Sequence, residues 1–383
     1  MALDEMRHDE LLNLYFDNED EKPYAVVAGR VYQVQRLTER GEWKIVDAQG
    51  TPGPYIVLDD NQHWQLDLNL RLRGGGGVVT RFLDSAATVS AEGSMVVEAS
   101  GMTEIRQAYR YRARRIDEAH AQARHYLENA LDNLHAHRPD GTLDPRVQRI
   151  VGDFFGVETP DQALLSRVEV AIKTLFEAMM DASLSPLTST RIVVGTNRPG
   201  RGHVTAFTIP RDPQQRIFLT DRFFRPPRFR LKPQAIEQGF ETLPHFQGAT
   251  LIHEVSHLVL DTKDIAYLES NAPFADLLRE DTAANVRTRA QIERLQDYRL
   301  SHRTPKPELF IQQEDGHWRD VRRDDALGYT SILRITGAKT LDEARTIFLA
   351  DVDKRSQVML KNADSVTLMI LRLGRHNYTA LNP

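Results

Sequence analysis

The stretch TLIHEVSHLVLDTKDIAY, residues 250–267, decides the fold of the C-terminal half of the chain. It places His253 and His257 four positions apart, with Glu254 directly after the first histidine. Positions i and i+4 of an α-helix lie on one face, so both imidazoles can point at one metal ion, while the glutamate is turned aside. Apolar neighbours predict that this helix, beginning near Gly248, is buried. The spacing predicts a metal site, and two hydrogen-bonded core histidines are the alternative.

The third ligand distinguishes these two interpretations. The chain contains no cysteine, so the ligands of any metal must be His, Asp or Glu. A further histidine six residues beyond the second one is excluded, because that position is Lys263. Two sources stay open. Glu269 and Glu280 follow at the distance at which a second helix supplies a glutamate, and Asp264 lies on the segment directly after the motif.

That segment, DTKDIAY (residues 261–267), resembles the G-T-x-D-x-x-Y signature of the aspzincins, the deuterolysin and peptidyl-Lys metalloendopeptidase family. Thr262, Asp264 and Tyr267 match, and Asp261 replaces the glycine of the signature. The resemblance implies a zincin-like fold with Zn²⁺ as cofactor and Asp264 as the third ligand. It also implies a zinc endopeptidase, in which Glu254 is the general base and Tyr267 donates a hydrogen bond to the developing oxyanion.

A second segment, NADSV (residues 362–366), resembles the N-A-D-[NS] segment that shapes the substrate pocket of this family. The resemblance implies that Asp364 binds a substrate side chain, which is lysine in the lysine-specific members. Those members carry an acidic residue three positions later, where this chain has Thr367. Carboxylates are also expected to orient the two histidines. The sequence does not identify them, and Asp261 and Asp324 are candidates.

The predicted fold class is α+β. Short alternating apolar runs separated by glycine and proline predict a β-rich module in residues 1–100, with the glycine run 74–77 as a flexible linker. Residues 101–185 carry two helical patterns and are expected to form an accessory region. The first pattern covers 104–134, and the second covers 160–180.

The zincin-like catalytic domain is predicted over residues 186–383. Strands are expected over 190–196, 203–209 and 215–224, followed by the motif helix. The strand over 215–224 is expected to pair with the backbone of the substrate. An insertion over 268–326 has the pattern of a helix and a loop and is expected to act as a lid.

Composition narrows the partners. The 383 residues carry a net charge of -5, which gives no reason to expect nucleic acid as a partner. No run of apolar residues is long enough for a membrane span. The start of the chain lacks the basic and apolar regions of a secretory signal.

The C-terminal half also resembles the aspzincin domains of bacterial toxins and secretion-system effectors. This resemblance implies a protein or peptide substrate, export from the bacterial cytoplasm into a target cell, and a cognate immunity or inhibitor protein. Two alternatives remain. One is a housekeeping cytoplasmic metallopeptidase whose cleft is covered by residues 104–184. The other is a non-catalytic binding module, against which the intact Glu254 argues.

Overall fold

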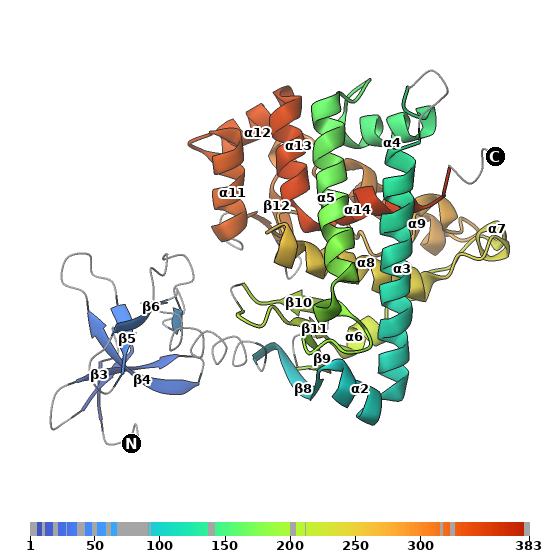
Figure 1. The fold of residues 1–383 in the computed structure, drawn as a ribbon. Coiled ribbons are helices and arrows are strands. Elements are labelled where there is room, and N and C mark those ends of the chain that lie inside the picture. Colours follow the sequence, from blue (N-terminus) through green and yellow to red (C-terminus); the bar gives the residue numbers. More distant parts are fainter. Residues whose placement is uncertain are drawn as a thin grey trace. The chain divides into compact units, whose positions relative to one another are not determined.

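The chain is mixed α+β, as predicted, and Figure 1 shows its ribbon. The computed structural model describes residues 6–9, 12–17, 22–27, 29–36, 43–47, 52–58, 63–66, 91, 93–136, 142–199, 204–210, 212–314, 317–321 and 326–378. The glycine run 74–77 and Asp324 lie outside these residues. The chain forms two compact units. One comprises Met1–Val96 and Ile209–Gln215, and the other comprises Val97–Thr208 and Arg216–Pro383.

The first unit is built on a seven-stranded sheet with the order β1-β2-β3-β4-β5-β6-β7. Consecutive strands pair antiparallel, and β3 also pairs with β7 at Val27 and Trp64, so the sheet curls toward closure. A small apolar cluster lies on its inner side, with Leu14, Val34 and Ile45 among its buried members. The strands are β1 (Arg7–Asp9), β2 (Leu14–Phe16), β3 (Pro23–Val27), β4 (Arg30–Arg36), β5 (Trp43–Val46), β6 (Pro52–Leu58) and β7 (Trp64–Leu66).

The second unit is mainly helical. Its helices are α2 (Met102–Ala108), α3 (Arg110–Leu134), α4 (Pro145–Phe155), α5 (Gln162–Met180), α6 (Asp221–Phe224), α7 (Pro233–Glu237), α8 (Thr242–Val259), α9 (Ala283–Glu293), α11 (Ala326–Thr336), α12 (Leu341–Ala350), α13 (Val352–Lys361) and α14 (Ala363–Gly374). Shorter turns are η2 (Ala182–Leu184), η3 (Ala275–Leu277), η4 (Arg294–Tyr298) and η5 (Lys306–Glu308). Its strands are β8 (Met95–Ser100), β9 (Ile192–Asn197), β10 (Ala206–Thr208), β11 (Ile217–Leu219), β12 (Ile311–Glu314) and β13 (His317–Asp320).

Four helices form the centre of this unit. Helix α8 packs against α3, α5 and α14, and α3 packs along α14 (Figure 1). The buried residues of α8 run almost without interruption from His245 to Ser256, which is the pattern of a helix enclosed on most sides. The predicted burial of the motif helix is therefore confirmed. The helix begins at Thr242, six residues before the expected start at Gly248.

The predicted accessory region shares its hydrophobic core with the rest of the second unit. Ile116, Leu127 and Leu175 from this region belong to the same buried cluster as Ile252 of the motif helix. The predicted helix over 160–180 agrees with α5, whose start is capped by Asp161, which accepts a hydrogen bond from the amide of Leu164 at 2.7 Å. The predicted helix over 104–134 is divided at Tyr109 into α2 and α3.

The small sheet next to the motif helix has the strand order β10-β11-β9-β8. Strand β11 pairs parallel with β9 and antiparallel with β10, so both of its edges are used. The expectation that residues 215–224 pair with a substrate is therefore wrong, because a central strand has no unpaired edge. The chain also leaves the strand at Thr220, whose hydroxyl caps α6.

The insertion over 268–326 is packed into the second unit. Leu268, Phe274 and Leu277 are buried in its hydrophobic core. Arg372 of α14 reaches the insertion by a hydrogen bond to the carbonyl of Gln296 at 3.0 Å. The first part of the insertion therefore belongs to the hydrophobic core, whereas a lid was expected. Among the described residues, no helix is long and apolar enough to cross a membrane.

Candidate metal centre

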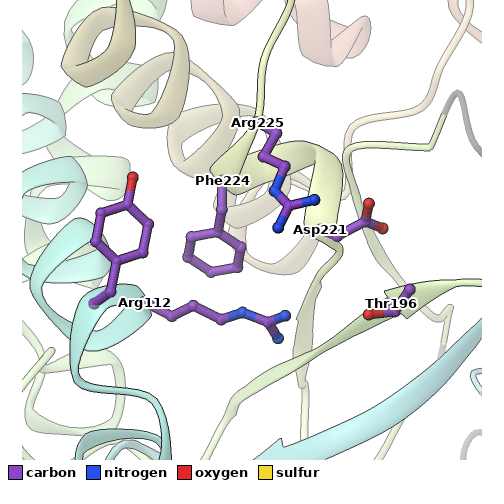
Figure 2. Close-up of a pocket in the computed structure, with 6 residues that line it drawn as sticks. Arg112, Thr196, Asp221, Phe224 and Arg225 are labelled. Atoms are coloured by element: carbon purple, nitrogen blue, oxygen red, sulfur yellow. The ribbon is translucent and has the colours of Figure 1, made fainter.

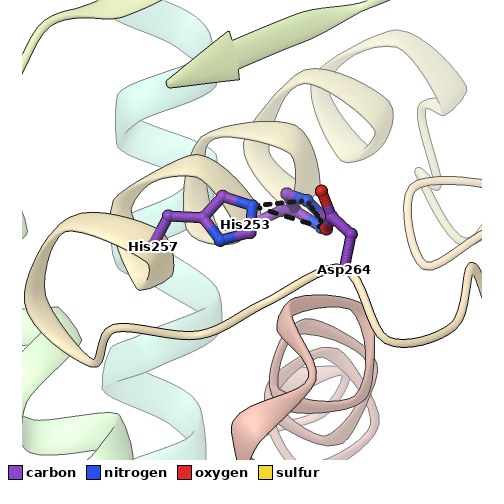
Figure 3. A group of neighbouring side chains, drawn as sticks. All are labelled: His253, His257 and Asp264. Carbon is purple, nitrogen blue, oxygen red and sulfur yellow. Dashed lines mark hydrogen bonds and ion pairs between the residues drawn. The ribbon is translucent and has the colours of Figure 1, made fainter. Parts of the chain in front are cut away.

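Helix α8 presents His253 and His257 on one face, as the sequence predicts (Figure 3). The two Nε2 atoms lie 3.2 Å apart, and the rings meet edge to face with centroids 4.9 Å apart. Both side chains are partly buried, with 15% and 17% of their surface exposed. Each imidazole is therefore mostly buried and keeps a small exposed surface.

The loop after α8 brings an aspartate to the same point. The chain turns at Asp261, whose φ is 52°, and Thr262 is then fixed by a hydrogen bond between its hydroxyl and that of Ser256 at 2.7 Å. The next residue, Lys263, donates its amide to the carbonyl of Lys361 at 2.8 Å. These contacts determine the course of the loop and leave the following side chain, Asp264, facing the histidines (Figure 3).

The three candidate ligand atoms form a compact triangle. Oδ1 of Asp264 lies 3.1 Å from Nε2 of His253 and 3.4 Å from Nε2 of His257. Zinc bonds of about 2.0–2.1 Å in a tetrahedral site separate neighbouring ligand atoms by about 3.3 Å. The three measured separations agree with one face of such a tetrahedron. The donor set and its spacing therefore fit Zn²⁺.

The outer nitrogen of each imidazole lies within hydrogen-bond distance of an acceptor, and the hydroxyl of Thr262 also lies 3.2 Å from Nδ1 of His257. Nδ1 of His253 donates to Oδ1 of Asp364 at 2.8 Å, and Nδ1 of His257 donates to the carbonyl oxygen of Thr262 at 3.0 Å. In a neutral imidazole the proton is then on Nδ1, so each Nε2 carries a lone pair. Two such lone pairs and the Asp264 carboxylate would then converge at one point, an arrangement that favours a bound cation, either a metal ion or a proton.

A shared proton is the alternative to a metal ion. Burial opposes charge on His253, but its bonds to Asp264 and Asp364 raise its pKa well above the ordinary value. Burial would raise the pKa of Asp264, but the charge of His257 and hydrogen bonds from both histidines lower it. Both pKa shifts come from the attraction between the positively charged histidines and the carboxylate of Asp264. A divalent cation bound at the same point would interact with this carboxylate more strongly.

Glu254 lies beside this triangle and is 4% exposed. Among the described residues, its Oε2 atom is buried and makes no hydrogen bond. Burial raises the pKa of this carboxyl, and the neighbouring histidines oppose that rise. A buried carboxylate oxygen without a donor is costly, and such atoms are concentrated where a ligand or water is bound.

Asp364 occupies a different place from the one expected. It is 6% exposed, and besides His253 its carboxylate accepts hydrogen bonds from the hydroxyl of Ser270 at 2.7 Å and from the amide of Leu268. Both of its oxygens are thus engaged inside the protein, so it orients a histidine and does not face an open substrate pocket. It supplies the carboxylate that the sequence left unidentified.

Asn362 is a structural residue of the centre that sequence reasoning missed. Its side-chain oxygen accepts from the amides of Ile265 and Ala266, both at 3.0 Å, and its side-chain nitrogen donates to the carbonyl of Ala266 at 3.0 Å. Asn362 is fully buried and connects the loop that carries Asp264, the ligand loop, to the start of α14. Asn362 is the first residue of the NADSV segment, for which the sequence predicted a role of Asp364 alone.

The other candidates have different partners. Asp261 pairs with Lys263 at 2.6 Å and with Lys361 at 2.8 Å. Glu280 pairs with Lys232 at 3.4 Å. Among the described residues, neither Glu280 nor Glu269 belongs to the cluster of candidate metal ligands. Tyr267 follows three residues after Asp264 and is 51% exposed. His245 is buried and is hydrogen-bonded at both ring nitrogens, so it has a structural role.

Comparisons with protein-family models, with curated proteins and with solved structures found no match to this chain.

Proposed function

We propose that the second unit is a zinc-dependent endopeptidase in which His253, His257 and Asp264 bind the metal. The observation that supports this most is the triangle of converging acceptors, whose separations of 3.1–3.4 Å suit a tetrahedral zinc site. When bound, zinc would supply a Lewis acid that lowers the pKa of an attacking water and polarises a peptide carbonyl.

Glu254 is the general base in this proposal. Its unpartnered Oε2 takes a proton from the attacking water and delivers it to the nitrogen of the leaving amine. The raised pKa of this buried carboxyl makes it a better proton acceptor than an exposed glutamate. Its place next to His253 on the helix keeps it beside the ligands but out of the triangle.

Two further elements would act on the substrate. Tyr267 is half exposed at the end of the ligand loop and donates a hydrogen bond to the carbonyl oxygen as it gains negative charge. Strand β10 forms the end of its sheet and packs on α8, so it replaces residues 215–224 as the strand that pairs with the substrate backbone. A toxin or effector role and an inhibitor protein as partner remain part of the proposal through the resemblance alone.

Metal content is the decisive measurement. Plasma mass spectrometry on the purified chain is expected to find about one zinc per chain, and a strong loss in both H257A and D264A. E254Q should keep its zinc and lose peptidase activity against a denatured protein substrate. Wild-type protein that takes up no metal after zinc is supplied would leave two core histidines and a shared proton, and would exclude the enzyme.

A further inference from the structure

A basic segment lies between the small sheet and the motif helix. Residues 222–232, RFFRPPRFRLK, contain four arginines and one lysine and no acidic residue, in a chain of net charge -5. We name these eleven residues the basic segment. Arg225, Arg228 and Arg230 are exposed. Three like charges within six residues repel one another, so this arrangement costs stability unless an anion binds.

These three arginines have no carboxylate partner among the residues that the structure describes. Other arginines of the same unit are paired. Arg375 binds Asp276 at 2.7 Å, Arg279 binds Asp281 at 3.2 Å, and Arg289 binds Glu280. Within the described part of the chain, many cations therefore have carboxylate partners, and the three clustered here do not.

The backbone of the basic segment is held at both ends. The amide of Arg225 donates to the carbonyl of Arg222 at 3.1 Å, and the amide of Lys232 donates to the carbonyl of Leu277 at 2.8 Å. Pro226 and Pro227 fix their φ angles, and Phe229 packs against the core. A segment fixed in this way loses little conformational entropy when a ligand binds.

A pocket lies at the start of the segment. It has a volume of about 210 Å³ and is lined by Tyr111, Arg112, Thr196, Asp221, Phe224 and Arg225. Figure 2 shows the guanidinium groups of Arg112 and Arg225 on the same side of the Phe224 ring. Both face the space that Thr196 borders. Arg112 and the hydroxyl of Thr196 already donate to the two carboxylate oxygens of Glu98, so Arg225 is the pocket cation that has no carboxylate partner among the described residues.

The basic segment is connected to the metal centre. Gln247, on α8 six residues before His253, donates its side-chain nitrogen to the carbonyl of Phe223 at 2.9 Å. The helix that carries His253 is thus hydrogen-bonded to the segment that carries the arginines.

We infer that the basic segment binds an acidic stretch of the protein that the metal centre cleaves. Arg225, Arg228 and Arg230 attract the stretch and pair with its Asp or Glu side chains. A protein is the occupant because the proposed substrate is a protein, and tighter binding of a nucleic acid is an outcome that the test can detect. The inference rests on the proposed function for the identity of this protein as a substrate.

Binding can be measured without catalysis. The probe is a fluorescent ten-residue peptide with five glutamates, and the protein is the full chain carrying E254Q. Fluorescence anisotropy at 50 mM NaCl should show binding that weakens markedly at 300 mM NaCl. R225Q/R228Q/R230Q should weaken binding about tenfold, since each exposed charge pair contributes modestly.

A matched control removes the same charge elsewhere. R149Q/R334Q/K339Q changes three exposed cations outside the basic segment, on α4, on α11 and in the turn after α11, and should leave binding unchanged within about twofold. Equal weakening in this control, equal binding of a peptide with glutamine for glutamate, or tighter binding of a single-stranded oligonucleotide would overturn the inference. D264A tests the other proposal separately, because it should lose zinc and still bind the acidic peptide.

Discussion

Asp364 and His253 are 111 residues apart in the sequence, and their side chains meet at 2.8 Å between Oδ1 and Nδ1. This bond selects the tautomer of the histidine and leaves Nε2 as the atom that faces Asp264. The segment NADSV therefore supports the candidate metal centre. Its aspartate orients a candidate ligand, and its asparagine holds the loop that carries Asp264.

The first prediction concerns this bond. D364A should lower zinc affinity about 10- to 100-fold, because partners of this kind fix the orientation and raise the basicity of a ligating histidine. D364N should also weaken it, since an amide nitrogen would face the amide of Leu268. Competition with a fluorescent zinc chelator measures the change. Unaltered zinc affinity with a changed cleavage preference would return Asp364 to the substrate pocket.

The second prediction separates chemistry from metal binding at Glu254. E254Q should bind zinc as the wild type does and lose at least about 100-fold in peptidase rate, because an amide cannot take the proton. The metal-free variant should unfold at a higher temperature than the metal-free wild type, since a buried carboxylate that lacks a donor is removed. Zinc loss in E254Q would show that the glutamate is itself a ligand.

The third prediction concerns pH and His245. The ring is buried, its Nδ1 accepts from the hydroxyl of Tyr126 at 2.8 Å, and its Nε2 donates to the carbonyl of Ala272 at 2.9 Å. Burial lowers the pKa of His245 to about 4. The hydrogen bond to Ala272 opposes this shift, and the charge of Arg375 adds to it. The unfolded chain therefore binds the proton more readily between about pH 6.5 and 4.

Stability from this group is thus fully present above about pH 6.5 and is lost as the pH falls toward about 4. The loss is at most about 3 kcal/mol. Thermal unfolding in EDTA should show that the stability of wild type and of H245Q converge as the pH is lowered through this window. Two curves that stay parallel would exclude His245 as the cause.

The fourth prediction tests the contact of α14 with α3. A Cβ on Gly374 would lie 2.1 Å from the carbonyl oxygen of Tyr126, so G374A must displace backbone and should cost about 2 kcal/mol. G248A is the matched control within the same core. Its Cβ would meet Gln122 and the amide of Ala123 at 3.1 Å, and the higher helix propensity of alanine offsets that contact. Chemical denaturation of both variants measures the difference, and equal losses would contradict it.

Much of the helical part of the fold could be predicted from local pattern. The periodic apolar positions of α3 and α5 lie on buried faces, because a helix repeats every 3.6 residues whatever it packs against. The strand over 215–224 was mistaken in two ways. The strand ends at Leu219, and both of its sides are paired, one with β9 and the other with β10. Edge and central strands have the same local pattern when both are buried.

The sequence by itself determined the spacing of His253, Glu254 and His257, since helix geometry alone puts the two imidazoles on one face and the carboxyl beside them. Only the tertiary structure decided that Asp364 holds the first histidine, that Asn362 holds the ligand loop, and that β10 ends the sheet. These contacts join residues about one hundred positions apart or elements whose order in the sheet differs from their order in the chain. They depend on how α8 and α14 pack in a shared core, which no local periodicity encodes.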